Sequence, residues 1–205
     1  MRFKAILGCL AVVVALLPSA AGAATPSALI ESFHQTLLAV MRSAAQTKAA
    51  ERYEQLKGPV DAAFNLPFMI QIAAGQKWRG ASEEEKARLT EAFKRVSAAT
   101  YAARFDGFSG ERFEILGEQD GPSGSRLVQT QIVRPGKDAV PITYVVRKFG
   151  DATSGETWRI IDVIVSGGIS ELAVRRSEYN GILAQGGVAG LIERLNQTAD
   201  RLLAS

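Results

Sequence analysis

The chain is poor in the residues from which many catalytic and metal sites are built. Its 205 residues include one cysteine, Cys9, and one histidine, His34. His34 follows Phe33 in a predicted helix with no acidic residue three or four positions later, so we expect a surface or half-buried histidine. Neither a Gly-x-Ser-x-Gly nor a His-Glu-x-x-His motif is present. The sequence therefore predicts no catalytic residue, no metal site and no cofactor, and it does not indicate an enzyme.

An excess of charge of one sign is also missing. The chain has 24 Lys and Arg against 21 Asp and Glu, a net charge of +3, and no basic run with interleaved aromatic residues. Removal of the amino-terminal segment, which contains Arg2 and Lys4 and no acidic residue, lowers this charge to +1. Such a balance gives little electrostatic support for binding to nucleic acid.

The amino-terminal segment has the features of a secretory signal. Two basic residues precede an apolar run over residues 6–17, which Pro18 ends, and the small residues Ala-Gly-Ala follow. A run of about 12 residues is too short to span a bilayer as a helix. We expect residues 1–23 to be cleaved before Ala24, and residues 24–205 to form one domain in the periplasm without any cysteine. An uncleaved anchor is the alternative.

The first half of the mature chain has a helical apolar period. Ile30, Phe33 and Leu37 recur three and four positions apart. Ser82 with Glu85 is the signature of a capping box, which opens a long helix. We predict helices over residues 26–44, 49–63, 66–74 and 83–103.

From residue 112 the apolar period changes to two, which is typical of strands. Four strands, near residues 113–116, 127–132, 140–147 and 158–165, are joined by short polar turns, so they should form an antiparallel meander. Asp162 in the fourth strand is expected to make a hydrogen bond at the rim of the sheet. Two helices follow, over residues 170–184 and 188–203. The predicted fold class is α+β: a curved four-stranded antiparallel sheet with helices packed on one face.

Many apolar residues of these elements either fill a core or line a cavity. The periodicity of the sequence does not separate the two cases, although close packing of protein interiors favours a core.

A series of short motifs runs in order along nearly all of the mature chain. They are Phe64-Asn65-Leu66, Gly75 with Trp78, Phe93, Thr100-Tyr101, Trp158 to Val163, Arg176-Ser177, Gly186-Gly187, and Leu191-Ile192 near Leu195. Together they resemble the MlaC family, also called the toluene-tolerance family, of periplasmic lipid-binding proteins that serve an ABC transporter. The segment from Ser170 to Tyr179 is more similar to the hopanoid-associated branch called HpnM.

This resemblance implies that the sheet and the helices enclose an apolar pocket for acyl chains. The implied cargo is a phospholipid or a hopanoid-type lipid. The implied partners are an inner-membrane ABC transporter complex and an outer-membrane lipoprotein complex, with transient contact to the membrane. Arg176 is the expected headgroup residue. The expected lipid-binding residues are Phe64, Phe68, Met69, Ile72, Tyr101, Phe105, Val128, Ile132, Ile142, Tyr144, Val146, Trp158, Ile160, Leu172 and Tyr179.

Two other functions stay open on the sequence alone. A periplasmic adaptor that binds proteins would need no lipid and would have a filled core. A hydrolase or a biosynthetic enzyme that acts on lipids would need His34 beside a serine or a carboxylate in a cleft.

Overall fold

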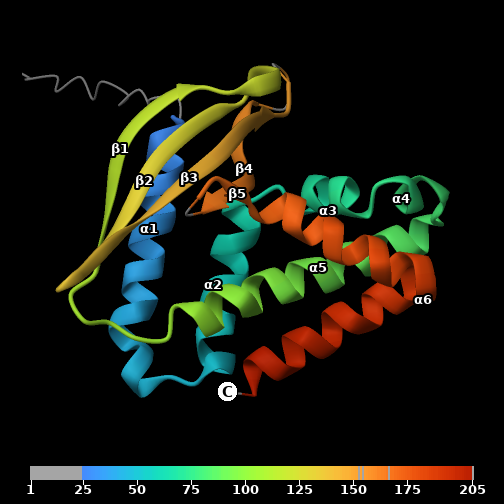
Figure 1. The fold of residues 1–205 in the computed structure, drawn as a ribbon, viewed down its shortest axis with the longest axis horizontal. Helices are drawn as coiled ribbons and strands as arrows, with labels where there is room; N and C mark the ends of the chain where they lie inside the picture. The colour runs from blue at the N-terminus through green and yellow to red at the C-terminus, as the bar shows by residue number, and fades with distance from the viewer. Residues whose placement is uncertain (1–24, 152, 154, 166, 205) are drawn as a thin grey trace, which may run out of the picture.

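The computed structural model describes residues 25–151, 153, 155–165 and 167–204, so the predicted signal segment lies outside the described residues. Helices come first, an antiparallel sheet follows, and a long helix ends the chain (Figure 1). The helices are α1 (Pro26–Ser43), α2 (Ala49–Ala63), α3 (Leu66–Ala74), α4 (Gln76–Gly80), α5 (Glu83–Arg104) and α6 (Glu171–Leu203), with 3-10 turns at Ala44–Gln46 and Pro122–Gly124. The strands are β1 (Arg112–Asp120), β2 (Arg126–Arg134), β3 (Lys137–Phe149), β4 (Thr157–Val165) and β5 (Ile169–Ser170).

Local side-chain hydrogen bonds satisfy the first backbone N–H groups of several helices, among them α1 and α5, whose starts were predicted. The hydroxyl of Thr25 accepts from the backbone N–H of Ala28 at 3.1 Å, with Pro26 at the first helical position of α1. At α5 the Ser82 hydroxyl accepts from the N–H of Glu85, and the Glu85 carboxylate accepts from the N–H of Ser82 at 2.8 Å. Both starts, including the capping box, are confirmed.

The sheet is an antiparallel meander in the order β1-β2-β3-β4-β5. The predicted meander is therefore confirmed, but the strand count of four is one too low over the described residues. The added strand, β5, has two residues and pairs with the end of β4 through Ile169 and Val165. Gly167 and Gly168 both have positive φ, at 81° and 79°, so the chain reverses within a tight turn instead of leaving the sheet.

The helices cover one face of the sheet, as predicted. In Figure 1, α1 runs along the sheet, and α5 and α6 cross below and beside it. The loop between α2 and α3 is tied to the sheet, because Phe64 forms a bridge with Ile160 and the N–H of Asn65 donates to the Ile160 carbonyl at 2.9 Å. This tie fixes the Phe64 backbone along the edge of β4, and the Phe64 ring contacts those of Phe33 and Tyr101.

The end of the sheet and the start of α6 are joined through Asp162. One oxygen of its carboxylate accepts from the Ser170 hydroxyl at 2.5 Å, and the other accepts from the backbone N–H of Leu172 at 3.0 Å. Asp162 therefore helps to cap α6, which confirms the predicted hydrogen bond at the sheet rim. Further along, α6 breaks at Gly187, where φ is 62°, so the two predicted helices follow one another across a kink.

Candidate functional site

A cavity of about 300 Å³ lies between the inner face of the sheet and the helices. Its volume is at the lower end of the range for small-molecule sites, about 300–1,000 Å³. The residues that line it come from α3, α5, α6, three strands and the chain next to α3 and α5: Phe64, Leu66, Met69, Ser97, Thr100, Tyr101, Arg104, Phe105, Ile132, Val140, Ile142, Tyr144, Val163, Val165, Glu171 and Arg175.

The sheet side of the cavity is an apolar wall, apart from one phenol. Along β3, every second side chain faces inward, which places Val140, Ile142 and Tyr144 in a row. The strand register sets Ile132 of β2 opposite Val140, and Val163 of β4 opposite Tyr144. Because register partners on one face are neighbours, these side chains form one continuous surface.

The helix side of the cavity is more polar. Ser97, Tyr101 and Arg104 are spaced by four and three residues on α5, so they follow one face of that helix. The Tyr101 ring packs edge-on against Phe33 at 5.3 Å between ring centroids and stacks on Phe105 at 5.8 Å. The lining therefore has an apolar sheet face and a helix face that carries hydroxyl groups.

His34 is buried between α1 and the inner face of the sheet, not at the surface or half-buried as the sequence predicted. Its Nε2 lies 3.0 Å from the hydroxyl of Tyr144, and its ring stacks on Phe113 at 4.2 Å between centroids. The spacing of α1 puts His34 on the apolar face that packs on the strands. Burial lowers the pKa of His34 to about 4, so the ring is neutral at pH 7. This hydrogen bond explains how a phenol is accommodated in an apolar wall.

Among the described residues, the side-chain hydrogen-bond partner of His34 is the Tyr144 phenol. A hydrolase would need a serine or a carboxylate at that position. Within the described part of the chain, no group of three or more His, Cys, Asp or Glu side chains is placed to hold a metal ion.

Three charged side chains lie at the edge of the cavity. Arg104 Nη1 is 3.3 Å from the Glu171 carboxylate, which joins the end of α5 to the start of α6. Arg175 Nη1 donates to the hydroxyl of Tyr179 at 3.3 Å. Burial raises the pKa of the Tyr101 phenol, while the positive charges of Arg175 and Arg104 act in the opposite direction. The negative charge of Glu171 acts with burial to raise this pKa, so all three charges influence one phenol inside the cavity.

A second hollow, of about 710 Å³, lies between α2, α5 and α6 and is open to solvent. Charged side chains line much of it, and Lys94 pairs there with Asp61 at 3.1 Å. This surface crevice is exposed to water and lined by charged side chains, so it is poorly suited to an alkyl chain.

Seven of the predicted lipid-binding residues come together in the cavity lining. They are Phe64, Met69, Tyr101, Phe105, Ile132, Ile142 and Tyr144.

The other predicted residues lie outside the lining. Val128, Val146, Ile160 and Tyr179 are buried in the core, Phe68, Trp158 and Leu172 are half-buried, and Ile72 is exposed. They share an apolar character with the lining, but their strand or helix positions direct them elsewhere. That any of these residues contacts lipid stays a prediction.

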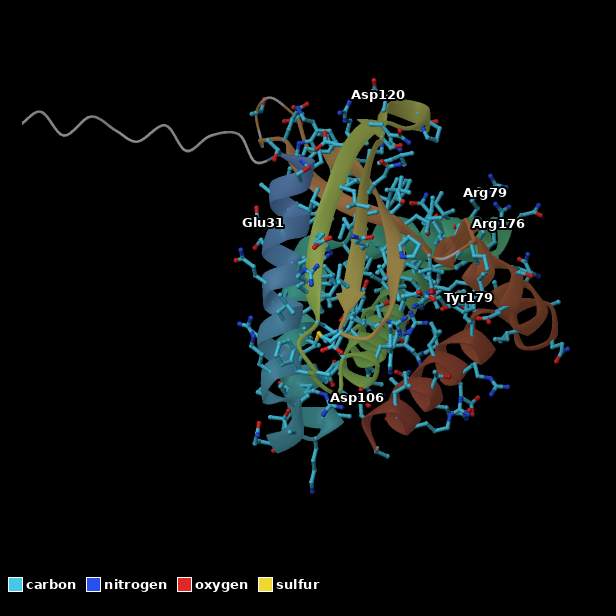
Figure 2. The ribbon with its side chains drawn as sticks, turned by 60° about the vertical axis from the view of Figure 1, so that its left-hand side comes forward. Glu31, Arg79, Asp106, Asp120, Arg176 and Tyr179 are labelled. Carbon is cyan, nitrogen blue, oxygen red and sulfur yellow. The ribbon has the colours of Figure 1, made fainter. Side chains whose placement is uncertain are left out.

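The expected headgroup residue, Arg176, does not line the cavity. Arg176 is exposed on the outer side of α6 (Figure 2). Its neighbour Arg175 lines the cavity. Sequence reasoning also missed the polar residues of α5. Their spacing puts Ser97 and Arg104 on the same helix face as Tyr101, and it could have predicted that they line the cavity with Tyr101. The polar rim residue Glu171 had no such signal, because the turn before α6 determines its position.

Comparison with known proteins gives a family and a fold. A family model described as MlaC protein matches residues 31–197. No curated protein matches the sequence significantly. Among solved structures, a phospholipid-binding protein from Ralstonia solanacearum, solved in complex with a phospholipid, has a TM-score of 0.71 at 17% sequence identity. The match covers 85% of this chain and 97% of that one. In the described part of this chain, no helix has the length and apolar character to cross a membrane.

Proposed function

Because the chain belongs to the MlaC protein family, we propose that it is a periplasmic lipid carrier that takes an acyl chain into the cavity under its sheet. The observation that carries this proposal is the cavity itself. An apolar wall of β-strand side chains faces a hollow of about 300 Å³, where a purely structural domain would have close packing. The cavity also weighs against the alternative of a protein adaptor with a filled core.

The physical need for such a carrier follows from the hydrophobic effect. Each buried CH₂ group is worth about 0.8 kcal/mol, so a tail of about 16 carbons costs roughly 12 kcal/mol to expose to water. A cavity that receives the tail replaces that exposure by exchange between two apolar environments. Binding and release of a lipid need no covalent step.

The cargo class and the partners belong to this proposal. The phospholipid in the Ralstonia solanacearum structure supports a phospholipid cargo, while the HpnM-like segment at the start of α6 favours a hopanoid-type lipid. We propose that the carrier exchanges lipid with an inner-membrane ABC transporter complex and with an outer-membrane lipoprotein complex. The signal-like amino-terminal segment supports a periplasmic location.

Two measurements on the purified mature protein test the proposal. Organic extraction followed by mass spectrometry should recover about one lipid per protein, and its masses will separate phospholipids from hopanoids. Transfer of a fluorescent lipid between donor and acceptor vesicles should accelerate with protein concentration. No extracted lipid, together with transfer at the rate without protein, would refute the carrier function.

A further inference from the structure

Two arginines line the cavity, Arg104 and Arg175, and they differ in their ion pairing. Arg104 is paired with Glu171, whereas Arg175 makes no ion pair with any described residue. Its guanidinium group lies 5.3 Å from the centre of the Phe93 ring and donates to the Tyr179 hydroxyl. These two contacts hold the planar group in place and leave most of its five N–H donors free.

Ser97 supplies an independent observation in the same cavity. Its side chain lines the wall, the residue is 5% exposed, and its hydroxyl forms no hydrogen bond with a described residue. The next hydroxyl on that face, of Thr100, donates to the Val96 carbonyl at 2.7 Å, as is usual for a helix. Among the described residues no fully enclosed side-chain oxygen or nitrogen lacks a partner, so the Ser97 hydroxyl is open to the cavity, where it can meet a polar group of the ligand.

We propose that Arg175 and Ser97 form a subsite for an anionic oxygen group, a phosphate or a carboxylate, at the polar end of the bound lipid. This inference rests on the proposed carrier function and adds a chemical class to the cargo. A guanidinium group binds such oxygens in a forked geometry, with stronger hydrogen bonds than a neutral donor makes. The tail then lies on the opposite, apolar wall of Ile132, Ile142 and Val163.

The charge at the rim is compatible with this assignment. Glu171 would repel an anion, but its carboxylate is already paired with Arg104 at 3.3 Å. The three rim groups together carry one positive charge, and Arg175 is the member without an ion pair. Arg176 carries the same charge one residue later, yet it is exposed and does not line the cavity.

The test compares a fluorescent fatty acid with the fatty alcohol of the same tail at pH 8, where the acid is ionised. The wild-type protein should bind the acid at least about tenfold more tightly than the alcohol, because charge-assisted hydrogen bonds add to the burial of the tail. Arg175→Gln should abolish this preference, so that this variant binds the acid and the alcohol with similar affinities. Arg176→Gln, the matched control, should keep the preference, and Ser97→Ala should reduce it by about threefold.

The outcomes separate the subsite from the carrier function. If the alcohol binds but the acid has no advantage, or if Arg175→Gln keeps the advantage, the subsite is wrong and the carrier stands. If neither probe binds the wild type, the carrier function itself fails. Should Arg175→Gln not fold, Arg175→Lys keeps the charge but loses the fork, and an undiminished preference in that variant would overturn the assignment.

A competition experiment with inorganic phosphate shows whether the subsite binds the headgroup of a lipid or a free anion. Excess inorganic phosphate should not displace the fatty acid, because phosphate lacks the tail that provides most of the binding. Displacement of the acid but not of the alcohol would assign Arg175 to a free anion and contradict the headgroup subsite.

Discussion

The substitution Ile142→Glu places an ionisable group in the middle of the apolar wall. Ile142 is half-buried and lines the cavity, so the empty cavity can hydrate the new carboxylate and the protein should fold. A bound tail removes that water, and the carboxyl must then be protonated. Its ordinary pKa is about 2.7 units below pH 7, which makes protonation cost about 3.7 kcal/mol. We expect lipid affinity at pH 7 to fall by up to about 500-fold.

The same reasoning predicts that the loss depends on pH. Binding by Ile142→Glu should recover as the pH falls from 7 toward 5, because protonation then costs less. Thr143→Glu is the matched control, since Thr143 is adjacent on β3, is equally half-buried and faces the opposite side of the sheet. Fluorescent lipid titrations at several pH values measure both variants. Unchanged affinity in Ile142→Glu, or an equal loss in Thr143→Glu, would refute the position of the tail.

Two further predictions concern the core around the cavity. Val146→Arg should unfold the protein, because Val146 is fully buried outside the cavity. An unpaired buried charge costs several kcal/mol, against a net stability of about 5–15 kcal/mol. A circular dichroism melt close to that of the wild type would contradict this prediction. Burial lowers the pKa of His34 to about 4, from about 6.5 in the unfolded chain. The unfolded state therefore binds the proton first, and the free energy of unfolding should fall by about 3 kcal/mol as the pH drops from 6.5 to 4. Urea unfolding of His34→Phe should lack this slope, and an unchanged slope would show that other groups cause it.

Much of the fold follows from local sequence signals. The capping box at Ser82, the change of apolar period after Arg112 and the break at Gly187 each depend on residues close together in the chain, and each was predicted correctly. The strand β5 was missed because Gly167 and Gly168 indicate a break, whereas whether the chain then returns to the sheet depends on the turn geometry.

The candidate site was predictable only in part. Alternation identified Ile142 and Tyr144 as inward-facing, but it also identified Val146, which faces the same side and is buried in the core. Position along β3 decides between cavity and core, since Val146 pairs with Ile160, where the Phe64 bridge closes the space. The periodicity of a strand predicts which face of the sheet a side chain is on. It does not predict how far that side chain lies from the helices that cover the face.

The position of the polar end required the structure for a similar reason. Arg175 and Arg176 are adjacent and chemically identical, and a helix turns by about 100° between them. Only the packing of α6 on α5, with Arg175 over the Phe93 ring, determines which guanidinium faces the cavity.

The central claim is that an alkyl tail lies between the helices and the sheet. A crystal structure with a fatty acid brominated near the end of its tail tests this directly, because anomalous scattering locates the bromine. We predict the bromine inside the cavity, within van der Waals contact of the Met69 and Ile142 side chains. Bromine in the charged crevice beside Lys94, or on the outer face of the sheet with the cavity filled by side chains, would contradict the account.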